Sequence, residues 1–446
     1  MHARLLSIGL GLVAFGLGVA AVAAAPDAAP SAAATGPKAY IGDFKDNTLA
    51  VFDTSANRVI KTIPIPAGPH GLVLTPDGKR LYASSDGDAV VSVIDTTTDE
   101  VTSTIDVGPT PHGLAVTPDG SRVLVAGFGT DQVEAIDTAT NQVVWQTPVP
   151  QPHNLAITPD GATVYAASQK QGSEALAILD VASGAETGSV SLDHTPRALN
   201  VSPDGADLVY TLAGVDALQV MDLASNQLET QIPTGVSPHH PLFVPSAKLG
   251  LVVSQGPGTL DVFDPASYTA SGTIKVGTMP HWIAASSDGH WAYVTNEQSN
   301  DLSVVDLTTQ KVTASVPVGN APRKIVVQSG PINAPMASPA GGSGASTSPT
   351  AAPAAAAPAP GAAASGPSVS IAKFAFSPAT LTVAAGQAIT ITNTDGVAHT
   401  STSDSGAWDS GELAPNGSYT VTLQQPGTYT YHCNIHPFMK ATIVVQ

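Results

Sequence analysis

Between residues 38 and 330 the chain repeats itself about every 42 residues, a periodicity that marks a propeller or a solenoid. Each unit contains four short alternating runs separated by turn residues, and in one unit these are 113–117, 123–126, 133–136 and 142–147. Four strands per repeat of this length are typical of β-propeller blades. The sequence therefore predicts an all-β chain whose larger part, 38–330, is a seven-bladed β-propeller.

Two sets of aspartates mark the repeat. One aspartate follows an apolar pair in each unit, at Asp53, Asp95, Asp137, Asp180, Asp222, Asp264 and Asp306. A second set belongs to Asp-Gly turns, at Asp77, Asp119, Asp160, Asp204 and Asp288. Aspartate side chains accept hydrogen bonds from nearby backbone N–H groups in tight turns, so we assign both sets to structure and not to chemistry.

The two ends of the repeat region predict how the ring closes. The chain enters at 39–41, which matches the second strand of a blade, and it leaves at 324–327, which matches a first strand. One blade would then combine both ends of the domain and hide its open edges. The tetrapeptide at 293–296 reads Tyr-Val-Thr-Asn, and the repeats resemble the YVTN family of seven-bladed propellers.

One repeat position, directly after a proline and before each first strand, carries only basic side chains. These residues are His70, His112, His153, Arg197, His239, His281 and Arg323. Because first strands line the channel of a propeller, we expect the seven to converge at one mouth of it. Imidazoles suit a transition metal, whereas the guanidinium groups attract an anion. A third interpretation, a structural residue copied with each duplicated blade, stays open.

The single cysteine of the chain lies in a pattern typical of copper sites. Cys433, His436 and Met439 are three residues apart, and His399 lies upstream between two strand-like runs. A thiolate, two imidazoles and a distant thioether form the ligand set of a type 1 (blue) copper centre. The alternating run 427–431 places the ligand loop after a strand. The pattern predicts one type 1 copper ion held by these four residues.

Residues 368–446 resemble a small cupredoxin, closest to the amicyanins and plastocyanins. The resemblance is carried by Phe376-x-Pro378, 381–383, Gly386, Asn393-x-Asp395, His399-Thr400, Gly427-x-Tyr429-x-Tyr431-His432-Cys433 and His436-Pro437-Phe438-Met439. It implies a Greek-key β-sandwich, the copper ligands His399, Cys433, His436 and Met439, and single-electron transfer. Many cupredoxins carry asparagine where Thr400 stands, which leaves the hydrogen bonding around the thiolate open. His432, beside the cysteine, is expected to point to the opposite face of its strand as a packing or surface residue.

Composition and the N-terminus restrict location and partners. A net charge of −18, from 17 basic and 35 acidic residues, argues against nucleic acid as a partner. Residues 1–25 combine a weakly basic start, an apolar run and a small-residue cleavage site, as in a secretory signal peptide. The alternative is an uncleaved membrane anchor. With cleavage, no other segment spans a membrane, and we expect a periplasmic or secreted protein.

Residues 331–367 separate the two domains and consist almost only of Ala, Pro, Gly, Ser and Thr. Such a composition cannot bury a core, so the sequence predicts a disordered linker. As a coil, its root-mean-square span is on the order of 35 Å, which tethers the copper domain and leaves it mobile.

Three functions fit these features. The first is an exported copper protein that transfers single electrons to or from a redox protein (a cytochrome, dehydrogenase or reductase), with the propeller as a docking or substrate module. The second is a copper-dependent oxidoreductase with an additional metal in the propeller ring. Its layout resembles nitrous oxide reductases, although their cupredoxin centre needs two cysteines and this chain has one. The third is an envelope binding protein or copper carrier without turnover.

Overall fold

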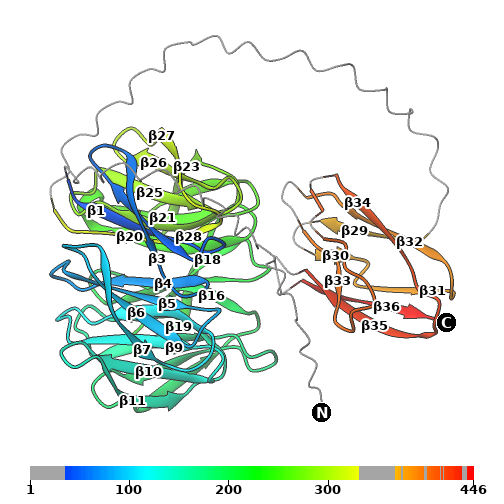
Figure 1. Ribbon diagram of the computed structural model, residues 1–446, viewed down its shortest axis with the longest axis horizontal. Coiled ribbons are helices and arrows are strands. Elements are labelled where there is room, and N and C mark those ends of the chain that lie inside the picture. The colour runs from blue at the N-terminus through cyan, green and yellow to red at the C-terminus, as the bar shows by residue number, and fades with distance from the viewer. Residues whose placement is uncertain are drawn as a thin grey trace, which may run out of the picture. The chain divides into compact units, whose positions relative to one another are not determined.

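The computed structural model is all-β apart from a 3-10 turn, Pro245–Ala247, and it describes two parts of the chain (Figure 1). The first part is 36–330, and the second comprises 367–372, 375–395, 399–411, 413–414, 416–433 and 439–446. The predicted signal peptide 1–25 and residues 331–366 of the predicted linker lie outside these ranges, as does the ligand candidate His436.

Residues 38–327 form seven antiparallel sheets of four strands each. The first blade contains β28 (Pro322–Val327), β1 (Lys38–Asp43), β2 (Thr48–Asp53) and β3 (Arg58–Pro64). The next three contain β4 (Pro69–Leu74), β5 (Arg80–Ser85), β6 (Val90–Asp95), β7 (Glu100–Asp106); β8 (Pro111–Val116), β9 (Arg122–Gly127), β10 (Gln132–Asp137), β11 (Gln142–Pro148); and β12 (Pro152–Ile157), β13 (Thr163–Ser168), β14 (Ala175–Asp180), β15 (Glu186–Ser191). The last three contain β16 (Pro196–Val201), β17 (Asp207–Leu212), β18 (Ala217–Asp222), β19 (Gln227–Pro233); β20 (Pro238–Val244), β21 (Leu249–Ser254), β22 (Thr259–Asp264), β23 (Thr269–Lys275); and β24 (Pro280–Ala285), β25 (Trp291–Asn296), β26 (Asp301–Asp306), β27 (Lys311–Pro317).

The ring closes as predicted. Strand β28, from the end of the repeat region, pairs antiparallel with β1 from its start, with Ile325 opposite Ile41. Each first strand also contacts the first strands of both neighbouring blades, and β28 contacts β4. The seven-bladed propeller is therefore complete, and its first strands surround the central channel.

Burial follows strand position within each blade. The second and third strands are buried over most of their length, whereas the outer strand alternates exposed and half-buried residues, as in Gln142–Pro148. Neighbouring blades share apolar clusters, and Leu124 of one blade packs in the same cluster as Leu179 of the next. The core of the propeller consequently lies between blades, which is why a single repeat cannot fold alone.

Both sets of aspartates are structural, as predicted. Asp95 accepts the backbone N–H groups of Thr97 and Thr98 at 2.7 and 3.2 Å, and each equivalent aspartate accepts one or both of the corresponding N–H groups. Asp119, in an Asp-Gly turn, accepts the N–H of Ser121 at 2.9 Å.

The C-terminal domain packs two mixed sheets around its own core. One sheet has the order β30 (Ala375–Ser377), β29 (Ser368–Ala372), β32 (Ala388–Asn393), β34 (Ser418–Thr422). The other has the order β31 (Thr380–Val383), β36 (Lys440–Val445), β35 (Gly427–His432), β33 (Thr402–Ser403). Ile371, Ile391, Tyr431 and Ile443 are buried between them. In the part of the chain described here, the structure contains no helix long and apolar enough to cross a membrane.

Candidate metal centre

Two strand ends bring Cys433 and Met439 together. Cys433 directly follows β35, and Met439 directly precedes β36, to which β35 is paired antiparallel. The backbone N–H of Cys433 donates to the carbonyl of Met439 at 3.1 Å. Both side chains are buried, with 0% and 2% of their surfaces exposed. The intervening residues 434–438, which include His436, lie outside the described part.

His399 approaches the same point from another segment. It pairs with Leu413 through the backbone, and its imidazole is fully buried. Its Nδ1 lies 3.7 Å from Sγ of Cys433. A thiolate and an imidazole bound to one ion at about 2.3 and 2.0 Å would be about 3.5 Å apart at a tetrahedral angle. The two donor atoms are thus spaced as common ligands of a metal ion.

Asp395 fixes the orientation of the His399 ring. Its Oδ2 lies 3.0 Å from Nε2 of His399, so that Nε2 carries the proton and Nδ1 faces Cys433 with its lone pair. Burial alone would lower the pKa of His399, but the Asp395 carboxylate and the Cys433 thiolate together raise that pKa above its usual value. The carboxylate therefore makes the ring a better electron-pair donor.

Thr400 contributes through its backbone. Its N–H donates to Sγ of Cys433 at 3.2 Å, and its hydroxyl lies 3.1 Å from that of Thr402. The hydrogen bond to the sulfur consequently does not depend on whether threonine or asparagine stands at this position. As expected, the neighbouring His432 points elsewhere: it is partly exposed, and its Nδ1 is 2.5 Å from Oδ1 of Asp404.

All seven basic residues of the propeller repeat occupy one structural position. Each is the second residue of a first strand, directly after the proline that begins it. The strand register shifts just beyond this proline in the blades that begin with β4, β8, β12, β16, β20 and β24. Bulges of this kind re-aim side chains, which fits residues turned away from the regular ladder.

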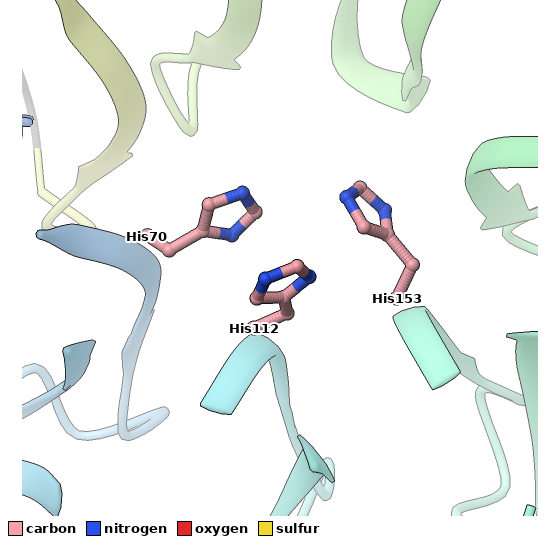
Figure 2. Close-up of side chains that lie close together, drawn as sticks. All are labelled: His70, His112 and His153. Atoms are coloured by element: carbon pink, nitrogen blue, oxygen red, sulfur yellow. The ribbon is translucent and has the colours of Figure 1, made fainter. Parts of the chain in front are cut away.

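The seven residues divide into two groups. Nitrogen atoms of His70, His112 and His153 all lie within 4.8 Å of one another (Figure 2). Among the other four residues, Arg323 donates to Glu297 at 3.1 Å, and Nε2 of His281 lies 3.8 Å from the same carboxylate.

In the first group, the His70 and His112 rings stack with centroids 4.5 Å apart, and the His153 ring stands perpendicular to the His112 ring at 5.0 Å. Burial is the main reason why the pKa values of His70 and His153 lie well below their usual range. The second cause is the charge of the neighbouring His112. The Phe128 ring stacks on the His112 ring with centroids 4.5 Å apart.

In the second group, the buried guanidinium of Arg197 donates to Ser237 at 2.8 Å and to Gln255 at 3.1 Å. The His239 and His281 rings are 4.3 Å apart. This half of the ring therefore combines arginines, imidazoles and a carboxylate, and differs chemically from the three-histidine half.

Comparisons with known proteins agree with both domains. A family model described as a YNCE-like beta-propeller matches residues 81–333, which is more than half of the chain, and a cupredoxin-like domain model matches residues 349–445. Amicyanin-alpha of Methylorubrum extorquens is 38% identical over 81 residues, covering 17% of this chain and 68% of that protein. The chain belongs to the YNCE-like β-propellers, and its C-terminal domain to the amicyanin-type cupredoxins.

Further relatives support the same division. The amicyanin of Paracoccus denitrificans is 34% identical and aligns over 62% of its own length and 17% of this chain. Among solved structures, hydrazine synthase of Kuenenia stuttgartiensis is similar with a TM-score of 0.56 and 20% identity, covering 60% of this chain and 91% of that one. A functionally unknown protein from Desulfotomaculum acetoxidans reaches a TM-score of 0.58 at 15% identity, covering 66% and 99%. At these identities the two structures indicate the fold alone.

The sequence of this YNCE-like propeller did not reveal which residues contact the ring of seven basic side chains. The residue directly after the second strand of each blade varies between aromatic, acidic, amide and alanine side chains: Phe44, Asp86, Phe128, Gln169, Ala213, Gln255 and Glu297. Asp86 lies 3.1 Å from His112, and the Arg323 guanidinium lies over the Phe44 ring at 3.6 Å. A repeat alignment extended by this one column would have found them, because they are equivalent positions.

Proposed function

We propose that this chain is an exported type 1 copper protein that transfers single electrons, with its copper held by His399, Cys433, His436 and Met439. The observation that carries the proposal is the 3.7 Å separation of His399 Nδ1 and Cys433 Sγ in a buried site beside Met439. When bound there, copper supplies a one-electron Cu(I)/Cu(II) couple.

The protein residues prepare this site for electron transfer. Asp395 holds the His399 ring in one orientation, and the Thr400 N–H stabilises negative charge on the sulfur. The buried side chains exclude water from the donor atoms. A preorganised donor set of this kind needs little rearrangement when the ion changes charge, which lowers the barrier to electron transfer.

The remaining parts of the proposal concern location, domains and partner. Residues 1–25 act as a signal peptide, so the mature protein is periplasmic or secreted. Residues 38–330 and 368–446 act as separate domains, joined by the linker 331–367. A redox protein (a cytochrome, dehydrogenase or reductase) exchanges electrons with the copper, and the propeller provides a docking or substrate surface. The resemblance to amicyanins supports a protein partner.

A second candidate function is an oxidoreductase whose propeller ring holds an additional metal. The clustering of His70, His112 and His153 favours it over a copper carrier without turnover, because a carrier needs no second cluster of imidazoles. Metal stoichiometry separates the candidates.

Electron self-exchange of the full chain tests the proposed function. We expect electrons to pass through His436, with Phe438 beside it at the contact surface. Phe438→Glu should slow self-exchange between reduced and oxidised protein, because it adds a charge where two copies meet. Thr428→Glu, which adds the same charge at an exposed strand position of the same domain, is the control. Equal rates in both variants, with the copper site intact, would contradict this route.

A further inference from the structure

The three-histidine group of the propeller has features of a metal site that are independent of the cupredoxin copper. His70, His112 and His153 come from the first strands β4, β8 and β12 of three consecutive blades, and their rings project into a common space (Figure 2). Among the residues that the structure describes, this is the one group of at least three histidine, cysteine or acidic side chains close enough to share an ion.

A hydrogen bond determines which nitrogen of the His112 ring is available. Nε2 of His112 lies 3.1 Å from Oδ1 of Asp86, so this nitrogen carries the proton and the lone pair is on Nδ1. Nδ1 of His153 lies 3.2 Å from the carbonyl oxygen of Arg197 and 2.9 Å from the side-chain nitrogen of Asn154. When Nδ1 donates to this carbonyl, the lone pair of the His153 ring is on Nε2. A carboxylate or carbonyl behind an imidazole is the usual outer partner of a metal-binding histidine.

Two of the inner nitrogens are buried without a partner. Nδ1 of His70 and Nδ1 of His112 have no hydrogen-bond partner in the structure. Nδ1 of His239 and His281 in the second group have none either, but among the described residues only the first group has three donors within 4.8 Å of one another. Leaving a buried polar atom unpaired costs about 1–3 kcal/mol, so such atoms call for an explanation. A bound ion would satisfy the nitrogens of His70 and His112 at once.

The positively charged groups near the three histidines have partners of their own. The guanidinium of Arg323 is paired with Glu297 at 3.1 Å, and that of Arg197 donates to Ser237 and Gln255. Nitrogens bound to one tetrahedral ion at about 2.0 Å lie about 3.3 Å apart, so binding requires only a modest inward rotation of the rings.

We propose that His70, His112 and His153 bind one divalent transition-metal ion, of the class that imidazole ligands favour, with Asp86 as the positioning residue of His112. Copper(II) and zinc(II) are the probes, and copper should bind more tightly because it stands higher in the affinity order of divalent ions. The other four members of the ring do not take part. The second candidate function above depends on this site, whereas the electron-transfer proposal does not.

The test uses the full chain with Cys433→Ser, which removes the thiolate of the cupredoxin site. After loading with copper(II) and removal of excess metal by gel filtration, this protein should retain one copper ion per chain. Its electron paramagnetic resonance spectrum should show nitrogen ligands. Adding His70→Ala and His153→Ala should abolish retention. Adding His239→Ala and His281→Ala instead, at equivalent positions on the opposite half of the ring, should leave it unchanged.

A further variant distinguishes a specific loss of copper binding from misfolding of the propeller. Asp86→Ala leaves all three imidazoles in place, and it should weaken copper binding 10–100-fold, as is usual for loss of an outer partner. The proposal is overturned if the Cys433→Ser protein retains no copper, or if the His239/His281 variant loses it equally. Binding of inorganic phosphate without metal retention would also overturn it, and would assign the ring to anions.

Discussion

At the scale of single residues, Asp395 decides how His399 presents itself to the metal. The carboxylate holds Nε2 at 3.0 Å, and the side chain of Asp395 is itself 14% exposed. We predict that Asp395→Ala lowers copper affinity 10–100-fold, because the imidazole ring loses its fixed orientation and some of its basicity. Competition with a chelator of known affinity measures the change.

The control is Asp404→Ala, which removes the carboxylate paired with His432 on the same domain. His432 is not a proposed ligand, so affinity should not change. If copper affinity fell as much in this control as in Asp395→Ala, the result would contradict a specific role of Asp395 in orienting His399.

Lys324 is the second residue with a measurable consequence. It is 8% exposed, and its ammonium lies over the Trp282 ring at 4.0 Å. Burial lowers the pKa of Lys324 from 10.5 to about 7. The unfolded chain therefore binds one more proton than the folded chain between pH 7 and 10.5, and stability should rise with pH in that window.

Comparison of wild type and Lys324→Met isolates this effect. The slope for one proton is at most about 1.4 kcal/mol per pH unit. We predict that wild type gains on the order of 1 kcal/mol more than Lys324→Met between pH 7.5 and 9, measured by chemical unfolding of the full chain. Parallel curves for the two proteins would show that the lysine is not titrating there.

Functional residues could be predicted from the sequence where their types and spacing are rare. They could not be predicted where their role depends on a contact with a residue distant in the sequence. Cys433 and Met439 were found because their types and spacing are specific to copper. Asp395 was noticed only as part of a resemblance. Asp86 was not noticed, because its position in the repeat could be aligned but its contact with His112 depends on a distance that the sequence does not give.

At the scale of strands, a hydroxyl in the second strand joins neighbouring blades. Thr295 in β25 accepts the N–H of Trp282 at 3.1 Å and donates to the carbonyl of Arg323 in the next blade at 2.6 Å. Ser84 and Thr211 make the same pair of bonds in their own blades. This is a physical reason for threonine in the Tyr-Val-Thr-Asn segment.

We predict that Thr295→Val destabilises the propeller by about 1–3 kcal/mol, because a buried N–H and a carbonyl lose their partner. Thr295→Ser, which keeps the hydroxyl, should cost much less. Chemical unfolding of both variants measures the difference. Equal destabilisation by serine and valine would indicate lost packing, and not the hydrogen bonds.

The strand pattern itself was predictable. Period-two alternation and Asp-Gly turns give four strands per blade, and matching the two ends of the repeat gives the closing blade β28-β1-β2-β3. The division of the basic ring was not predictable, because the preceding blade places a different side chain beside each equivalent residue: Asp86 beside His112, and Glu297 beside Arg323.

At the scale of the whole molecule, each domain has its own apolar core. Ile391 and Tyr431 belong to the C-terminal core, whereas Leu124 and Leu179 belong to a core shared by two propeller blades. We predict two unfolding transitions in calorimetry of the full chain. Copper at 100 times its dissociation constant should stabilise the cupredoxin transition by about 2.7 kcal/mol.

The Cys433→Ser variant assigns these transitions. It should keep both of them and lose the copper-dependent shift of the cupredoxin transition, because the thiolate is gone. A single transition for the full chain would contradict the independence of the two domains.

The central claim is that Cys433 is the thiolate ligand of a type 1 copper ion, and the visible absorption spectrum of the oxidised, copper-loaded full chain tests it most directly. We predict an intense thiolate-to-copper charge-transfer band that bleaches on uptake of one electron per chain and is absent in Cys433→Ser. A wild-type protein that binds copper and stays colourless, or a band that persists in the serine variant, would contradict the claim.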